Sequence, residues 1–279
     1  MSNANIVLQI QSTYNQLTRT EKKVADYVLQ NKNKVLYMSI TDLADACKVG
    51  DTSVYRFCRT LGLDGYQQFK MKLSISLPEH ELLDEEDEEK EESTASRIME
   101  SHMNAIRESY LLLSPEKLDR LVEMIDESEK VYFFGIGDSL LTAEEARNKF
   151  LRITSKVVCL TDPHMQSMAA SMATERDLIV IISYSGSTKD NIHVAKIAKR
   201  AGAKIACITH YKKSPLTAYS DVTLLCGAEE APLEGGSMSA KMGQLYLIDL
   251  LYQEYYARNY EKSRKNNKVT SSAVVEKLY

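Results

Sequence analysis

Four hydroxyl side chains crowd one short stretch, SYSGST, directly after the apolar run DLIVII. They belong to Ser183, Ser185, Ser187 and Thr188, and Gly186 stands among them. Hydroxyl donors, a flexible glycine and the unpaired N–H groups of a helix that begins here together suit a phosphate group. The structural alternative is a polar turn with an ordinary N-cap. The concentration of hydroxyls favours the phosphate site.

A second stretch with similar chemistry is GIGDS, Gly135 to Ser139, at the end of another apolar run. Its glycines let the backbone approach an anion at a helix N-terminus. A dinucleotide site would continue G-x-G-x-x-G, but the third position is Leu140, and Asp162 is only a nominal ribose ligand. The pattern therefore argues against a nicotinamide cofactor, and we expect no cofactor.

Both stretches need a scaffold that brings strand ends together. From Ser93 onward, short apolar runs alternate with helix-length segments such as 140–152, 163–172 and 188–201; the runs are Val131 to Phe134, Val157 to Leu160, Leu178 to Ile182, Ile205 to Ile208 and Val222 to Leu225. Continuous apolar strands separated by helices predict an α/β fold with a parallel sheet flanked by helices. Such sheets bind ligands at the carboxyl ends of their strands.

The first 77 residues have a different pattern, which predicts an all-α domain. Thr18 and Glu21 form a capping-box pattern ahead of a helix. A short helix over 41–47 is followed by a three-residue break and a second helix, DTSVYRFCRTLG, from Asp51 to Gly62. Its Val54, Phe57, Cys58 and Leu61 have the spacing of one buried stripe, and Gly62 suits the helix end. Two helices joined by a tight turn predict a helix-turn-helix.

The outward face of the second helix carries hydroxyl and guanidinium groups, which contact bases and phosphates in DNA readers. The residues that we expect to bind DNA are Lys48 in the break and Thr52, Ser53, Tyr55, Arg56 and Arg59 on the helix. An ordinary amphipathic helix with a solvated face is the alternative.

Charge divides the chain of 279 residues, whose net charge is −4. Residues 1–77 carry +4, residues 78–92 carry −9 and residues 93–279 carry +1. We therefore expect a DNA-binding domain over 1–77, an acidic linker over 78–92 and the α/β domain over 93–279. Its tail, from about residue 260, is basic through Lys262, Arg264, Lys265 and Lys268.

Several classes are disfavoured. No apolar run approaches the roughly 18 to 20 residues of a membrane span, and the N-terminus shows no secretory signal, so we expect a cytoplasmic protein that contacts no membrane. The five cysteines are scattered and read as reduced thiols. The five histidines are scattered too, so no metal site is expected.

Taken together, these stretches resemble a known family. GIGDS, DLIVIISYSGSTKD and EGGSMSAKMGQLYLIDLL are similar to the sugar isomerase (SIS) domain, which binds phosphosugars. EKKVADYVLQN and SITDLADACKVGDTSVYRFCRTLGLDGYQQFK resemble the helix-turn-helix of RpiR/MurR transcriptional regulators. Both occur in the family's order over nearly the whole chain. One departure is Gly50, where the family commonly has a Ser or Thr N-cap.

The resemblance implies a regulator, usually a repressor, of sugar or amino-sugar genes that senses a phosphorylated sugar. It places the phosphate on Ser183, Ser185, Ser187 and Thr188, with Gly137 and Ser139 closing the other side. A helix that starts near Ser237 adds to the site, and Glu234 is a weaker candidate. Glu144 and Glu145 could imitate the acid of a related enzyme, although exposed helix charges are the simpler interpretation.

Two other functions compete with the regulator. One is a phosphosugar isomerase or lyase with an accessory helical domain, but an enzyme gains nothing from Arg56 and Arg59 on a recognition face, and few histidines accompany the serine-rich turn. A pure oligomerisation scaffold leaves SYSGST unexplained. We expect a non-enzymatic regulator without catalytic residues, which binds double-stranded operator DNA as a homo-oligomer, a dimer or tetramer, through apolar helix surfaces of the α/β domain.

Overall fold

The computed structural model describes residues 5–77, 93–227 and 238–275 of the chain. These residues form two compact units, and the division falls between Ile98 and Met99. The acidic segment 78–92, Glu234 and Ser237 lie outside the described residues.

The first unit consists of short helices around one apolar core. They are α1 (Ile6–Thr13), the 3₁₀ turn η1 (Tyr14–Gln16), α2 (Arg19–Gln30), α3 (Lys32–Leu36), α4 (Ile40–Cys47), α5 (Asp51–Thr60) and α6 (Tyr66–Ile75). Val54, Phe57, Cys58 and Leu61 are buried, which confirms the predicted stripe. Burial raises the pKa of the Cys58 thiol to about 12, so this group stays protonated.

Capping boxes begin two of these helices. Thr18 and Glu21 cap α2 reciprocally, as predicted, and Ser39 and Asp42 do the same for α4. Thr60 at the end of α5 donates a hydrogen bond to Glu21 at 2.7 Å. Partial burial favours the neutral acid, but the hydrogen bonds from Thr18 and Thr60 outweigh it and hold the pKa of Glu21 below its usual value. One carboxylate thus starts α2 and ties it to α5.

The second unit is a parallel five-stranded sheet in the order β2-β1-β3-β4-β5. Its strands are β1 (Lys130–Gly135), β2 (Val157–Cys159), β3 (Asp177–Ile182), β4 (Lys204–Thr209) and β5 (Val222–Leu225). Every predicted strand is present, and all six residues of β3 are buried. The strand order reverses between β1 and β3, which is where such sheets bind ligands.

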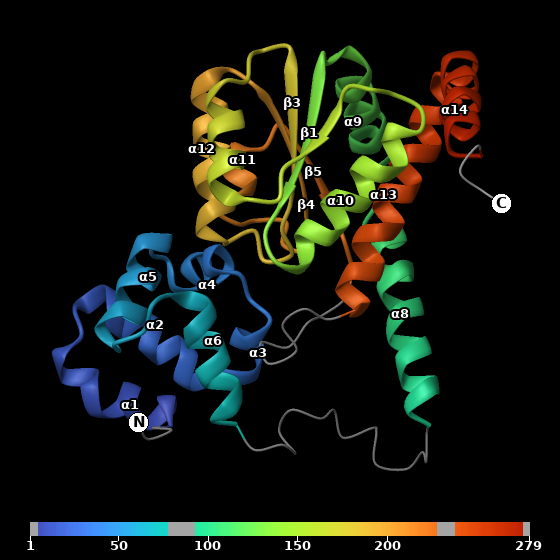
Figure 1. Ribbon diagram of the computed structural model, residues 1–279. Helices are drawn as coiled ribbons and strands as arrows, with labels where there is room; N and C mark the ends of the chain where they lie inside the picture. The colour runs from blue at the N-terminus through green and yellow to red at the C-terminus, as the bar shows by residue number, and fades with distance from the viewer. Residues whose placement is uncertain (1–4, 78–92, 228–237, 276–279) are drawn as a thin grey trace. The chain divides into compact units, whose positions relative to one another are not determined.

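Helices cover both faces of the sheet (Figure 1). On one face lie α9 (Pro115–Glu127), α10 (Asp138–Leu151) and α13 (Met238–Arg258); on the other lie α11 (Pro163–Ser171), α12 (Lys189–Ala201) and the 3₁₀ turn η2 (Thr217–Tyr219). Alternate residues of β1 supply the two cores: Val131 and Phe133 face the first layer, and Phe134 faces the second. The predicted fold class is confirmed.

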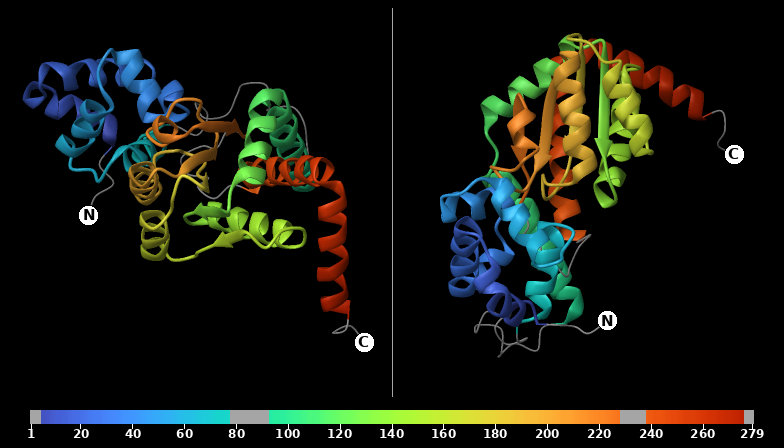
Figure 2. Two further views of the ribbon diagram at one scale, coloured as in Figure 1. Left: turned by 90° about the horizontal axis from the view of Figure 1, so that it is seen from above. Right: turned by 90° about the vertical axis from the view of Figure 1, so that its left-hand side faces the viewer.

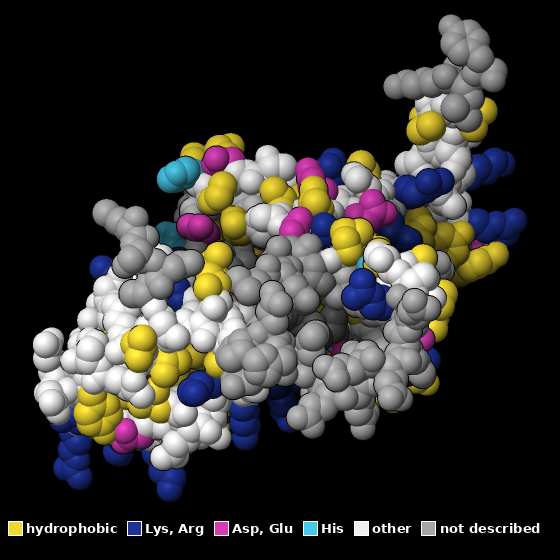
Figure 3. All heavy atoms as spheres, turned by 90° about the horizontal axis from the view of Figure 1, so that it is seen from below, with side chains coloured by type: hydrophobic (Ala, Val, Ile, Leu, Met, Phe, Trp, Pro, Cys, Tyr) yellow, Lys and Arg dark blue, Asp and Glu magenta, His cyan; other side chains and the backbone are white. Residues whose placement is uncertain are grey.

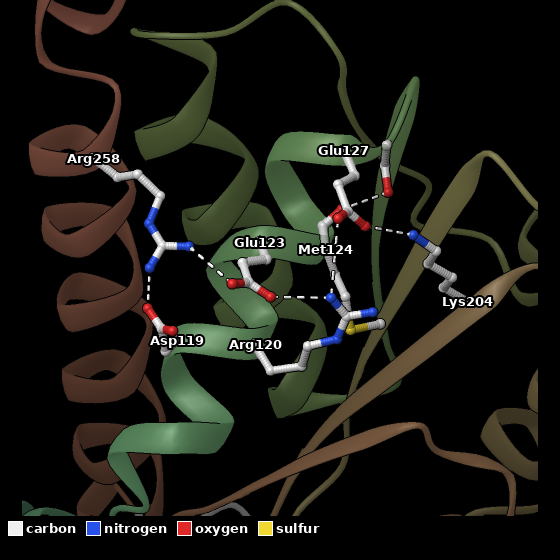
Figure 4. Close-up of polar contacts among 8 residues, drawn as sticks. Asp119, Arg120, Glu123, Met124, Glu127, Lys204 and Arg258 are labelled. Atoms are coloured by element: carbon white, nitrogen blue, oxygen red, sulfur yellow. Dashed lines mark hydrogen bonds and ion pairs between the residues drawn. The ribbon is translucent and has the colours of Figure 1, made fainter.

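Ion pairs join α9 to its neighbours along an exposed face (Figure 4). The pairs link Arg258 of α13 with Asp119 and Glu123, Arg120 with Glu123 and Glu127, and Lys204 of β4 with Glu127. The hydrogen bond from Lys204 lowers the pKa of Glu127 below its usual value. Because these groups are exposed, the network orients α9 more than it stabilises the fold.

Two further helices complete the second unit, which includes α8 from Met99 onward. α8 (Thr94–Leu111) lies beside the start of α13, and α14 (Tyr260–Val275) extends away from the sheet (Figure 2). The predicted basic tail is therefore helical, and its Asn266 and Thr270 donate hydrogen bonds to the carbonyls of Ile153 and Arg152. Among the described helices, none combines the length and apolar character that crossing a bilayer requires.

Candidate DNA-binding and phosphosugar-binding sites

The turn between α4 and α5 has the predicted length of three residues. Lys48 ends α4 in the left-handed conformation, with φ of 54°, and the N–H of Val49 donates to the carbonyl of Ala44 at 2.9 Å. Gly50 is the N-cap of α5 and offers no side-chain bond, and the N–H of Ser53 donates to its carbonyl at 2.8 Å. Backbone bonds therefore shape the turn, and the Thr41 hydroxyl of α4 donates a hydrogen bond to the Asp51 carboxylate at the start of α5, at 2.8 Å.

Thr52, Arg56 and Arg59 share the exposed side of α5, whereas Ser53 and Tyr55 are half-buried at its flanks. The guanidinium of Arg59 donates to the carbonyl of Leu63 and pairs with Asp64, both at 3.2 Å, which holds it over the C-terminal end of the helix. Lysine and arginine side chains project from the helical unit at the lower left of Figure 3. The exposed side of α5 can contact the phosphates and base edges of DNA.

The serine-rich turn follows β3 and is held by backbone and side-chain bonds. The N–H of Gly186 donates to the carbonyl of Ser183 at 3.2 Å, and the N–H of Ser187 donates to the hydroxyl of Ser185 at 3.2 Å. Ser183 is buried; Ser185, Ser187 and Thr188 are half-buried. Thr188 is the N-cap of α12, but its hydroxyl makes no capping bond. No side chain of the turn caps the first-turn N–H groups of α12, and a helix N-terminus of this kind suits an anion.

The tertiary fold brings the two predicted stretches together. β1 and β3 are neighbours in register, with Gly135 opposite Ile182, so the stretches that follow them share the carboxyl edge of the sheet. Gly137 has φ of 60° and is the N-cap of α10, and Ser139 is half-buried in its first turn. A Cβ at Gly135 would lie 2.6 Å from the carbonyl oxygen of Ser139, so only glycine permits this tight turn. Two helix N-termini thus open at one edge.

Two side chains that the sequence did not single out also lie at this edge. His210 follows β4 and stacks on Tyr184, with ring centroids 5.0 Å apart, and its Nδ1 lies 3.1 Å from the carbonyl oxygen of Cys226. The ammonium of Lys241 on α13 lies 3.2 Å from the Asp138 carboxylate, in the first turn of α10. The sequence could have pointed to His210, because this residue directly follows a predicted strand. It contained no comparable pattern for Lys241, because α13 is far from the two turns in sequence.

The acidic residues that the sequence offered for other roles near this edge have local structural surroundings that explain them. Asp162 is the N-cap of α11 and accepts a hydrogen bond from the N–H of Met165 at 2.9 Å, so it serves the helix start rather than a ribose. Glu144 and Glu145 lie in the second turn of α10 rather than the first. Glu145 is exposed and borders a groove with α13, while the charge of Glu144 acts on Cys159 of β2. The two carboxylates therefore form no pair.

Comparisons with known proteins identify both domains. A helix-turn-helix model of the rpiR family matches residues 4–80, and a SIS-domain model matches residues 124–253. An uncharacterized HTH-type transcriptional regulator of Haemophilus influenzae is 34% identical over 255 residues, 89% of this chain and 88% of that protein. HexR of Pseudomonas aeruginosa, an HTH-type transcriptional regulator, is 33% identical over 250 residues, 88% of this chain and 87% of its own.

A solved structure is similar over nearly the whole length of the chain. The NanR protein of Vibrio vulnificus, complexed with ManNAc-6P, matches 99% of this chain and 100% of its own, with a TM-score of 0.86 and 27% identity. Together with the matching models and relatives, this likeness identifies the chain as a member of the RpiR family of HTH-type transcriptional regulators, with an N-terminal helix-turn-helix and a C-terminal SIS domain.

Proposed function

We propose that this regulator binds double-stranded operator DNA through α5 and a phosphorylated sugar at the carboxyl edge of its sheet, and that it acts as a repressor of sugar or amino-sugar genes. The observation that carries the proposal is the meeting of two glycine- and hydroxyl-bearing turns at one edge, each opening a helix N-terminus. The bound ManNAc-6P of the Vibrio protein supports the same ligand class. A protein that binds operator DNA works in the cytoplasm of a bacterium, and we therefore propose that location.

The ligand site in this proposal consists of Gly137, Ser139, Ser183, Ser185, Ser187 and Thr188, with Glu234 and Ser237 as further candidates. The Lys241 ammonium adds positive charge beside the first turn of α10, which favours an anion there. The domain limits remain those that the sequence suggests: DNA binding over 1–77, a linker over 78–92 and ligand binding over 93–279. The family models at 4–80 and 124–253 support this division.

A thermal-shift panel tests the effector class. It contains ManNAc-6P, several hexose phosphates, the same sugars without phosphate, and inorganic phosphate. At about 100 times its dissociation constant, a true effector stabilises the protein by roughly 2.7 kcal/mol, which raises Tm by about 5–10 °C for a domain of this size. The proposal fails if no phosphorylated sugar outperforms its unphosphorylated counterpart.

One observation favours an isomerase activity: His210 lies next to the serine-rich turn. His210 is, however, already close to the Cys226 carbonyl and stacked on Tyr184, and Glu144 and Glu145 form no acid pair. We therefore propose that the protein is not an enzyme. Incubation with the stabilising sugar phosphate, followed by NMR, should show the ligand unchanged.

DNA binding is expected to depend on the outward face of α5. Arg56→Ala or Arg59→Ala should weaken operator binding by about 1–3 kcal/mol where the lost contact is to a base, or lower the salt slope by about one unit where it is to phosphate. Fluorescence anisotropy at several salt concentrations measures both quantities. Arg200→Ala, which removes an exposed arginine of α12, is the control. Unchanged DNA affinity in both α5 variants would show that another face reads the DNA.

We also propose that the protein works as a homo-oligomer, a dimer or tetramer. Each copy presents one recognition helix, and specific binding by helix-turn-helix proteins generally uses two half-sites about one helical turn apart. Exposed apolar side chains on the α/β unit, such as Leu141 and Met168, are available to an interface.

A further inference from the structure

The helix α8 carries an apolar stripe on its exposed side. Met99, Met103, Ile106 and Tyr110 are spaced four, three and four residues apart, which is the spacing of a coiled-coil seam. Their exposed fractions are 54%, 47%, 38% and 63%. Two methionines, an isoleucine and a tyrosine in one exposed line are more than scattered surface apolar residues.

An adjacent side of α8 is already occupied. Ala105 and Ser109 are buried, and the Ser109 hydroxyl accepts a hydrogen bond from the N–H of Gly227 at 2.8 Å. A Cβ at Gly227 would lie 2.7 Å from the Ala105 carbonyl oxygen, and one at Gly243 of α13 would lie 2.8 Å from the Ser109 hydroxyl. These two glycines thus allow α8 to pack closely against the α/β unit. This docking holds the stripe on another face of α8, which is exposed and borders a groove beside α13.

The stripe continues into a groove between α8, α10 and α13. The groove has a volume of about 550 Å³, and Ile106 lines it with Leu141, Met242, Leu245 and Tyr246. Lys149 and Asp249, 2.7 Å apart, stand at its edge. A helix laid on the stripe would therefore also cover apolar surface of α10 and α13.

We propose that the stripe binds α8 of a second copy of this chain, with the two helices antiparallel. In this register Met103 lies against the partner's Ile106, and Met99 lies against the partner's Tyr110. The seam is then continuous and self-complementary about a two-fold axis. The inference deepens the proposed oligomerisation by assigning its surface.

Charge selects the direction of the pairing. Glu100 and Arg107 flank the stripe on the same side, seven residues apart, and both are exposed. The Arg107 guanidinium donates a hydrogen bond to the side-chain amide oxygen of Asn104 at 2.9 Å, and this neutral partner does not compensate its charge. An antiparallel pair places Glu100 beside the partner's Arg107 twice. A parallel pair instead places Arg107 beside the partner's His102 and offers no opposite charges.

The first test removes the apolar seam. Met103→Glu with Ile106→Glu, made in the full chain, should raise the dissociation constant of the dimer by about 100-fold or more, because four buried apolar side chains become charged. Sedimentation velocity over a concentration series measures the change. Ser101→Glu, which places the same charge on the other side of α8, is the matched control and should leave the dimer intact.

The second test exchanges the charges of Glu100 and Arg107. Both positions are exposed, so the substitutions should not disturb folding. Arg107→Glu alone, or Glu100→Arg alone, turns two attractive pairs into two repulsive ones and should raise the dissociation constant by about tenfold. The double variant Glu100→Arg with Arg107→Glu restores both pairs and should recover the wild-type value.

The outcomes separate the interface from oligomerisation itself. Rescue by the double exchange together with loss of the dimer in the seam variant supports the antiparallel α8 pair. A wild-type dimer that tolerates the seam variant overturns this interface but keeps the proposed oligomer, as does a single exchange without rescue. A monomeric wild type at micromolar concentration, with and without DNA, overturns both. The phosphosugar thermal shift is measured alongside to show that each variant is folded.

Discussion

Replacing Ser185 and Thr188 together by alanine is expected to abolish the response to the phosphosugar while DNA binding without effector stays near that of the wild type. In the proposed site each hydroxyl donates a hydrogen bond to a charged phosphate, and such a bond contributes about 1.5–3 kcal/mol. Losing both should weaken effector binding by roughly 100-fold or more. The fold should tolerate the change, because Thr188 makes no capping bond and Ser185 accepts one bond from Ser187.

The measurement is operator affinity by anisotropy, with and without the stabilising sugar phosphate. A ligand shifts DNA affinity only if it contacts two arrangements of the protein differently. α10 and α12 both begin at the carboxyl edge of the sheet, so drawing their N-termini onto one phosphate, as proposed, can move the surfaces that they form. Ser171→Ala with Ser272→Ala, two exposed serines that bond within their own helices, is the control. A folded Ser185/Thr188 variant that loses effector-free DNA binding would contradict the scheme.

The substitution Gly186→Ala is expected to disrupt the same turn through the backbone. Gly186 has φ of +57°, and a Cβ there would lie 2.1 Å from the Ser214 hydroxyl and 3.2 Å from that of Thr209. Left-handed strain costs about 1–2 kcal/mol, and overpacking against buried neighbours adds about 1–3 kcal/mol. We expect a loss of about 2–5 kcal/mol in the free energy of unfolding, together with loss of phosphosugar binding.

Gly202→Ala is the matched control for this prediction. Gly202 also has a positive φ, +87°, but the atom nearest to an added Cβ is the Glu175 nitrogen, 4.0 Å away. Its substitution should cost only the strain, about 1–2 kcal/mol, and leave ligand binding intact. Urea unfolding and the thermal-shift panel compare the two variants. Equal costs would mean that Ser214 moves aside and that the crowding at Gly186 is not important.

Local patterns in the sequence were enough to locate most elements. The strands β1, β3 and β4 each agree with the predicted apolar run to within one residue at either end, because a buried parallel strand needs continuous apolar side chains. The capping pair Thr18 and Glu21 and the stop at Gly62, whose φ is +74°, were predicted for similar reasons. Caps and left-handed stops depend on residues within one turn, so a short stretch of sequence contains all the information.

The roles of individual polar side chains could not be predicted from local sequence patterns. Asp162, a nominal ribose ligand from spacing alone, is bonded to the N–H of Met165 as a helix cap. Arg59, one of the expected DNA contacts, is held by Leu63 and Asp64 near the end of α5. In both cases a neighbouring group in space, which the local pattern does not reveal, bonds the side chain.

By itself, the sequence determined the order of the two domains, the strands of the sheet, the helix-turn-helix and the two turns rich in glycine and hydroxyls. Only the tertiary structure decided that His210 stacks on Tyr184, that Lys241 stands beside the first turn of α10, and that the apolar seam of α8 faces outward. The physical reason is the sequence distance over which each kind of interaction acts. Periodicity and capping act over a few residues, whereas strand order and helix docking bring together side chains that are about 100 residues apart, such as Asp138 and Lys241.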